Sequence, residues 1–190
     1  MYSGKNGYSC ECGVDSTEIF NDDRRRTMEY FRDGNLNDLD ELKRISQTAY
    51  MEAFYDLLDT EDVKEYVNNK YTLQHLEEEI RDKANYFLLY YVDDKVTGYM
   101  KYILKPNSLE IERLYMLKNF KGMGVGSQFM TKAENVAKFN GKNILTLGVL
   151  EINKPAISFY KKRGFVQFSR ESVVIGKTRQ PLLLMKKELI

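Results

Sequence analysis

The sequence predicts a single α/β domain of the α+β kind, with a mixed, mostly antiparallel sheet and helices on both of its faces. Three strand-like runs between residues 86 and 117 follow one another through short turns, which predicts an antiparallel meander. An amphipathic stretch then leads to a buried-type strand over residues 144–150, and such a strand–helix–strand unit brings a parallel neighbour into the sheet. Apolar residues at helical spacing before the meander predict the second helical layer.

The chain begins with a stretch whose composition differs from the rest. Residues 1–27 contain few large apolar side chains, three glycines and three consecutive arginines. Such a composition predicts a flexible N-terminal extension. The compact domain is expected over residues 28–190, and a short strand over residues 28–32, ended by Asp33 and Gly34, opens it.

Three helices are predicted between this strand and the meander. The first starts from a cap at Asn37 or Asp38 and runs to about residue 55, with apolar residues at helical spacing: Leu39, Leu42, Ile45, Ala49 and Ala53. The second covers residues 60–68 after a cap at Asp59 or Thr60, and the third covers residues 73–82. This part of the chain is acidic, with carboxylates at Asp56, Asp59, Glu61, Asp62, Glu65, Glu77, Glu78 and Glu79.

The remaining elements alternate between strands and helices. The meander comprises strands over residues 86–92, 96–103 and 109–117. The long helix that follows ends at Gly141 and buries one face, formed by Val125, Phe129, Ala133, Val136 and Phe139. The domain is completed by a strand over 144–150, a helix over 154–162, and strands over 165–174 and from 181 to 186 or beyond.

Composition excludes some functions. The net charge of +1 gives no general attraction to nucleic acid or to an anionic membrane. No apolar run approaches the roughly 18–20 residues that span a bilayer, and the N-terminus lacks a secretory segment. We therefore expect a soluble, cytoplasmic protein without nucleic-acid or membrane partners. A structural zinc site needs about four ligands. Cys10, Cys12 and His75 are too few to supply them, so no metal is expected.

A glycine-rich loop precedes the long amphipathic helix. It consists of Lys121, Gly122, Met123, Gly124, Val125, Gly126 and Ser127. Alternate glycines let the backbone approach an anion, and the N–H groups and dipole at the start of a helix favour negative charge. The loop lacks the lysine of a P-loop and the third glycine of a dinucleotide fingerprint. It therefore predicts binding of a phosphate or pyrophosphate, with a plain tight turn as the structural alternative.

Residues 110–165 resemble the GNAT superfamily of acetyl-CoA-dependent N-acetyltransferases. Residues 111–117 resemble the family's central strand, residues 121–126 its pyrophosphate loop, and residues 153–165 its Asn-x-x-Ala-x-x-Phe-Tyr-x-x-x-Gly-Phe segment. More loosely, the resemblance extends over residues 28–190. Lys121 departs from the pattern, because the family usually has Gln or Arg there, and lysine lacks the planar fork of an arginine.

The resemblance implies acetyl-CoA as the cofactor and a sheet whose central strands splay apart. It implies that Met116 and Leu117 offer backbone groups to the pantetheine arm, that Asn153 contacts the same arm, and that Tyr160 lies near the thioester sulfur. In the family an amine attacks the thioester carbonyl directly, a backbone N–H stabilises the oxyanion, and an acid protonates the leaving thiolate. Tyr160 suits the role of the acid. The residues alone are also consistent with a core aromatic at Tyr160 and a helix cap at Asn153.

A general base is also needed, because a free alkylamine titrates near the lysine pKa of about 10.4 and is protonated at neutral pH. By the two-residue period of a strand, Glu110 and Glu112 lie on one face of the predicted central strand. Both are candidate bases, and Glu112 is preferred because it lies nearer the expected acetyl group. The alternative is that both are exposed members of an amphipathic strand.

The first hypothesis for the acceptor is a small-molecule amine. The acidic segment between Asp56 and Glu79 would attract a polyamine such as spermidine, and residues 49–54 and 147–149 resemble family members that acetylate polyamines. The alternative is that these acids are solvated helix faces. An acyl-CoA sensor without turnover and a protein or peptide N-acetyltransferase stay open as other functions. Residues 181–190 are predicted to form an exposed edge strand at which a second copy can pair, giving a homodimer.

Overall fold

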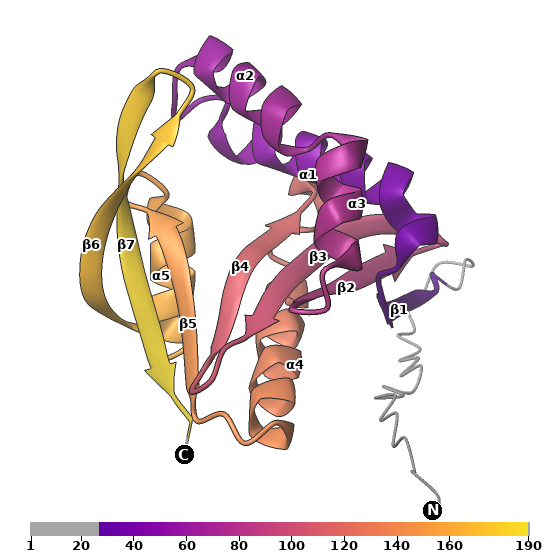
Figure 1. Ribbon diagram of the computed structural model, residues 1–190, viewed down its shortest axis with the longest axis vertical. Coiled ribbons are helices and arrows are strands. Elements are labelled where there is room, and N and C mark those ends of the chain that lie inside the picture. Colours follow the sequence, from indigo (N-terminus) through magenta and orange to yellow (C-terminus); the bar gives the residue numbers. More distant parts are fainter. Residues whose placement is uncertain (1–26, 190) are drawn as a thin grey trace, which may run out of the picture.

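The computed structural model describes residues 27–189, which form one seven-stranded sheet flanked by helices (Figure 1). Cys10, Cys12 and nearly all of the expected N-terminal extension lie outside these residues. The strands lie in the order β1 (Glu29–Asp33), β2 (Asn85–Val92), β3 (Lys95–Leu104), β4 (Leu109–Met116), β5 (Ile144–Leu150), β7 (Thr178–Glu188) and β6 (Val166–Ile175). All neighbouring strands are antiparallel except β4 and β5, which are parallel. The predicted meander and the predicted parallel neighbour are both confirmed.

Helices cover both faces of the sheet, as predicted. One face carries α1 (Leu39–Phe54), α2 (Thr60–Lys70) and α3 (Leu73–Arg81), and the other carries α4 (Val125–Phe139) and α5 (Lys154–Lys162) (Figure 1). Two short 3-10 helices, η1 (Leu36–Asp38) and η2 (Lys118–Phe120), precede α1 and follow β4. A separate buried core lies between the sheet and the helices on each face, so the sheet is the middle layer of the domain.

The buried face of α4 differs from the prediction at its end. Phe129, Ala133 and Ala137 are fully buried, whereas Phe139 is 79% exposed. Phe139 follows Ala137 by two residues, which is about 200° around a helix, so it lies nearly opposite the buried face. The prediction that Phe139 belongs to the core is therefore wrong.

The start of α1 agrees with the prediction in position. Asp38 is the N-cap residue of α1, although its side chain makes no cap hydrogen bond to that helix, and the side chain of Asn35 caps the preceding η1. The Asp38 carboxylate instead forms an ion pair with Arg32 (Nη2–Oδ1 2.5 Å). This contact ties the start of the first helix to β1.

The last strand is not an edge. β7 pairs with β5 on one side and β6 on the other, and the sheet ends at β1 and β6. The chain turns back after β6, so β7 fills the place next to β5, where Leu147 faces Met185. Residues 181–188 therefore have no free backbone edge for a second copy, and that route to a dimer is excluded.

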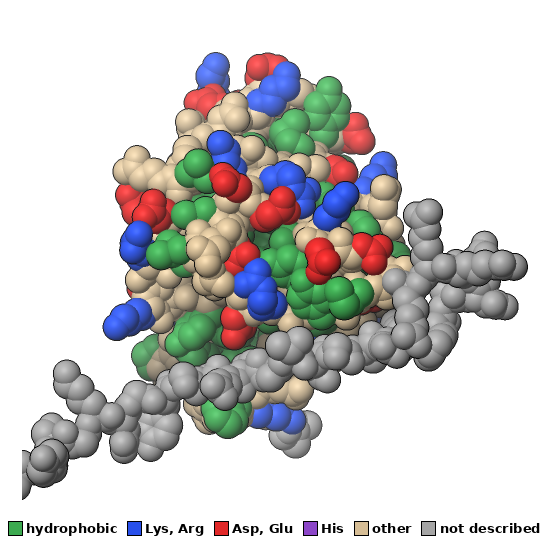
Figure 2. Space-filling view, turned by 90° about the vertical axis from the view of Figure 1, so that its right-hand side faces the viewer, with side chains coloured by type: hydrophobic (Ala, Val, Ile, Leu, Met, Phe, Trp, Pro, Cys, Tyr) green, Lys and Arg blue, Asp and Glu red, His purple; other side chains and the backbone are tan. Residues whose placement is uncertain are grey.

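The surface carries charges of both signs. On the side of the molecule shown in Figure 2, lysine and arginine side chains lie among aspartate and glutamate side chains, and neither sign forms a patch of its own on this side. No helix within residues 27–189 combines the length and the hydropathy needed to span a membrane.

Candidate active site

The central cavity lies where β4 and β5 separate. The two strands pair only between residues 109–111 and 145–147, at one end of the parallel contact. Beyond Ile111 they diverge, as Figure 1 shows, and they enclose a cavity of about 620 Å³. A volume of this size lies within the range of small-molecule and cofactor sites. The splay that the family resemblance implied is therefore present.

A β-bulge at Glu112 shapes the wall of this cavity. Tyr102 pairs with Ile111 and Lys101 pairs with Arg113, so Glu112 is an extra residue on β4. The bulge breaks the alternation of the strand: Ile111 packs in the core under α4, whereas the Arg113 guanidinium lies 5.3 Å from the centre of the Tyr71 ring on the α1 side. It also places Glu112 among the residues that line the cavity.

Glu112 is held by two buried cations. Its carboxylate lies 2.7 Å from Lys101 Nζ and 3.2 Å from Arg113 Nη2. The side chains of Lys101 and Arg113 are each only 4% exposed, so both charges need partners inside the protein. These ion pairs orient the Glu112 carboxylate toward a fixed position at the cavity wall.

Glu79 on α3 completes the charged cluster. It accepts two hydrogen bonds from Arg113, at 2.7 and 2.6 Å, and lies 3.1 Å from Lys101 Nζ. Burial raises the pKa of Glu79, but the hydrogen bonds and charges of Arg113 and Lys101 outweigh burial and leave that pKa below its usual value. Lys101, Arg113 and Glu79 did not emerge from the sequence as site residues. The available signal was a cation near the middle of each of two neighbouring strands of the meander.

Glu110, the other candidate base, lies apart from this cluster. Its carboxylate is 3.3 Å from Lys105 Nζ, and its side chain is not part of the cavity wall. Because the bulge at Glu112 interrupts the period of two, Glu110 and Glu112 have different surroundings although they are two residues apart. The structure brings only Glu112 to the cavity.

The glycine-rich loop forms one end of the cavity. Gly122 and Gly124 both have φ of +84°, a left-handed conformation that disfavours residues with a side chain. Gly124 is also the cap residue of α4. Within the described part of the chain, the backbone N–H groups of residues 122–126 donate no hydrogen bond. Free N–H groups at the start of a helix, with Lys121 beside them in the cavity wall, fit a phosphate group.

Met116 and Leu117, whose backbone groups were expected to bind the pantetheine arm, differ in their contacts. Leu117 donates its N–H to Thr97 O (2.9 Å), and its carbonyl accepts from Phe120 N–H (3.0 Å). Both of its backbone groups are therefore taken, and Leu117 does not line the cavity, so its predicted role is not supported. Alternation along β4 turns the backbone groups of Met116 the other way, toward the gap between β4 and β5, and Met116 lines the cavity.

Asn153, the cap residue of α5, and Tyr160, within α5, lie on the opposite wall. The Asn153 side-chain oxygen accepts a hydrogen bond from Ala156 N–H at 3.2 Å, so the cap is formed and the amide nitrogen is left for another partner. Tyr160 lies in the core, with its ring 5.3 Å from Phe159 and 5.8 Å from Phe165, yet it also lines the cavity. Burial raises the pKa of Tyr160 to about 12. Asn153 is thus a helix cap and Tyr160 a core residue, and both also face the cavity.

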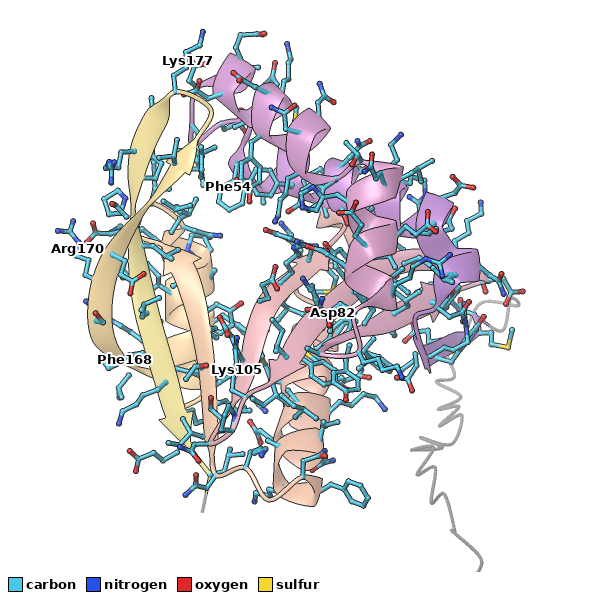
Figure 3. All side chains as sticks on the ribbon, in the orientation of Figure 1. Phe54, Asp82, Lys105, Phe168, Arg170 and Lys177 are labelled. Atoms are coloured by element: carbon cyan, nitrogen blue, oxygen red, sulfur yellow. The ribbon has the colours of Figure 1, made fainter. Side chains whose placement is uncertain are left out.

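Aromatic residues from α1, α2 and β4 line the cavity beyond Glu112. The Tyr50 ring stacks on Tyr66 at 4.8 Å and contacts Phe54 at 4.6 Å and Tyr115 at 5.9 Å. Figure 3 shows Phe54 at the end of α1, on the side facing the β6–β7 hairpin. The acidic segment contributes little here, because Asp59 caps α2 and Glu79 pairs with Arg113. Among the described residues that line the cavity, the single carboxylate is Glu112.

Comparison with known proteins identifies the class. Residues 48–165 match the Acetyltransferase (GNAT) family. An uncharacterized N-acetyltransferase in the pepI 3'region of Lactobacillus delbrueckii subsp. lactis is 34% identical over 161 residues, which are 80% of this chain and 93% of that protein. The spermidine N(1)-acetyltransferase of Thermoplasma acidophilum is 24% identical over 135 residues, or 69% of this chain and 84% of that protein.

The fold agrees with this result. The crystal structure of the PaiA N-acetyltransferase of Thermoplasma acidophilum in complex with coenzyme A has a TM-score of 0.73 and 22% identity, and it covers 84% of this chain and 98% of that chain. At this identity the likeness concerns the fold. The chain belongs to the Acetyltransferase (GNAT) family, and it is an N-acetyltransferase that uses acetyl-CoA.

Proposed function

We propose that the protein acetylates a primary amine by direct attack of the amine on acetyl-CoA, with Tyr160 as the acid and Glu112 as the base. One observation carries the proposal: both side chains face the same cavity, which begins at the glycine-rich loop. The two groups have opposite tasks, since one supplies a proton and the other accepts one.

The chain offers a place for each part of the donor. The free N–H groups of residues 122–126 and the Lys121 ammonium would hold the pyrophosphate. The Met116 backbone and the Asn153 amide would hold the pantetheine arm along the gap between β4 and β5. When bound, acetyl-CoA supplies the acetyl group as a reactive thioester.

Tyr160 supplies the proton that the departing thiolate needs. Its pKa of about 12 keeps the hydroxyl protonated at neutral pH. Its position at the cavity wall is fixed by Phe159 and Phe165, which pack against the ring. A buried phenol in a fixed position therefore serves as the general acid.

Glu112 accepts the proton of the amine, directly or through a water molecule. Lys101 and Arg113 fix the carboxylate, and its side chain remains 29% exposed, so the cavity can reach it. The acceptor amine then lies between Glu112 and the aromatic side chains, whose faces attract a cation.

We further propose a polyamine as the first acceptor to test. Similarity to the spermidine N(1)-acetyltransferase of Thermoplasma acidophilum supports this choice. The Glu112 carboxylate and the aromatic wall supply a cation site, whereas the acidic segment itself lies mostly outside the cavity.

The test is release of the coenzyme A thiol from acetyl-CoA with spermidine, spermine, lysine, a glycine-ended peptide and no amine. Amine-dependent release would support the transferase, and the preferred amine would identify the acceptor. Binding of acetyl-CoA without release from any amine would contradict the proposal and favour a sensor. A higher kcat/KM for the peptide than for spermidine would favour a peptide N-acetyltransferase.

A further inference from the structure

The tip of the β6–β7 hairpin is fastened to α2. Lys177 N–H donates a hydrogen bond to Asp62 Oδ1 at 3.0 Å, and Asp62 is only 6% exposed. Figure 3 shows Lys177 at the hairpin tip, beside α2. Gly176 has φ of +56°, and a Cβ added there would lie 2.5 Å from both Cβ and Cγ of Asp62. The contact, which we name the Asp62–Gly176 latch, is therefore closely packed and requires a glycine.

The latch spans the acceptor end of the cavity. Val173 and Ile175 on β6 and Tyr66 on α2 all line the cavity, so the hairpin and α2 are its two walls beyond Glu112. An extended polypeptide needs an open groove between such walls, because its backbone occupies the full width of the groove. The latch joins the two walls at the hairpin tip and so closes that end of the space between them.

A second, smaller hollow lies outside the latch. It has a volume of about 290 Å³ and is lined by Glu65, Tyr66, Asn69, Lys70, His75 and Gly176. Tyr66 faces both this hollow and the central cavity. The Tyr66 ring, which stacks on Tyr50 at 4.8 Å, therefore lies between the two spaces, and the outer hollow presents a carboxylate, Glu65, and an ammonium, Lys70.

We infer that the Asp62–Gly176 latch restricts the acceptor to a slender, unbranched alkylamine and that it excludes polypeptide substrates. The inference rests on the proposed function. Asp62 and Gly176 act on specificity and take no part in the chemistry, since neither lines the central cavity.

Two pairs of variants test the latch. Asp62→Ala removes the acceptor of the Lys177 N–H bond, whereas Asp62→Asn keeps a side-chain oxygen in its place. Gly176→Ala drives a Cβ into Asp62, whereas Gly141→Ala has a comparable positive φ of +66° but no atom within 4 Å of the added Cβ. The second member of each pair controls for charge loss and for backbone strain.

The measured quantities are the ratio of kcat/KM for spermidine to that for a glycine-ended peptide, and the hydrogen-exchange rate of the Lys177 amide. We expect wild type to prefer spermidine by on the order of 100-fold, and Asp62→Ala and Gly176→Ala to reduce this ratio by about tenfold while Lys177 exchanges faster. Asp62→Asn and Gly141→Ala should keep both values near wild type.

Three results would overturn the inference: a wild type that uses the peptide as well as spermidine, latch variants with faster Lys177 exchange but an unchanged ratio, or a Lys177 amide that exchanges as fast in wild type as in Asp62→Ala. Absence of thiol release with every acceptor is a different result. It would reject the proposed function itself.

Discussion

Arg113 on β4 and Glu79 on α3 form a two-point ion pair, with Nη1–Oε2 at 2.7 Å and Nη2–Oε1 at 2.6 Å. The pair joins the strand that carries Glu112 to the helix that covers it, and Lys101 bridges the two carboxylates. The proposed base and the buried charges therefore belong to one cluster: Glu79 neutralises buried charge, and Glu112 faces the cavity.

Replacing Glu79 should destabilise the protein strongly. Glu79→Gln leaves Arg113 buried without a full counter-charge, and we expect a loss of about 3 kcal/mol in the free energy of unfolding at pH 7. The matched control is Glu77→Gln on the same helix, whose exposed pair with Arg81 (2.7 Å) should contribute at most about 0.5 kcal/mol. Urea unfolding measures both, and equal losses would contradict the assignment.

The stability that Glu79→Gln loses relative to wild type should depend on pH. The pKa of Glu79 is lower in the folded protein than its usual value of 4.5, so its stabilisation is complete above that value and disappears as pH falls through the folded-state pKa. The stability difference between wild type and Glu79→Gln should therefore shrink below pH 4.5. A difference that stays constant down to acid unfolding would refute the pKa direction.

Removing the Tyr160 hydroxyl should slow turnover without weakening donor binding. For Tyr160→Phe we expect kcat to fall by about 100-fold, because a general acid is lost, and KM for acetyl-CoA to change little. Tyr90→Phe, which removes a hydroxyl that donates to Glu29 outside the cavity, is the control. Since the Tyr160 pKa is about 12, the acid stays protonated through neutral pH, and the wild-type rate should not decline on its account until pH approaches 12.

Replacing Glu112 should cause a loss of activity that becomes smaller at alkaline pH. Glu112→Gln removes the base, and we expect kcat/KM for the amine to fall by about 100-fold at pH 7. The defect should diminish toward pH 10, because the free amine loses its proton near its own pKa of about 10.4. Glu110→Gln on the same strand should retain wild-type activity, and a pH-independent defect in Glu112→Gln would assign Glu112 a structural role only.

The conformation of the glycine-rich loop can be tested by calorimetry. Gly124→Ala and Gly141→Ala both place a side chain at positive φ, so each should lose about 1–2 kcal/mol of stability. Only Gly124→Ala should weaken coenzyme A binding, by about tenfold or more, because it alone distorts the free N–H groups. Equal coenzyme A affinity in the two variants would show that the loop does not hold the pyrophosphate.

Most of the fold could be read from local patterns. The order of helices and strands, the loop at residues 121–127 and the short helix carrying Tyr160 follow from periodicity, caps and glycine positions, which neighbouring residues determine. Those patterns also brought Asn153 and Tyr160 into the candidate site. Their dual roles as cap and core residue were already among the alternatives, because both roles depend on the same helix.

Long-range contacts decided the rest. Only the pairing of β3 with β4 reveals the bulge that separates Glu112 from Glu110, and only the folding back of the hairpin places β7 inside the sheet. The Lys101–Glu79 pair and the Asp62–Lys177 contact join residues far apart in the chain. The sequence by itself determined the elements and the donor loop, because these depend on nearby residues. The tertiary structure determined which candidate base faces the cavity and where the β6–β7 hairpin meets α2, because these depend on which distant segments meet.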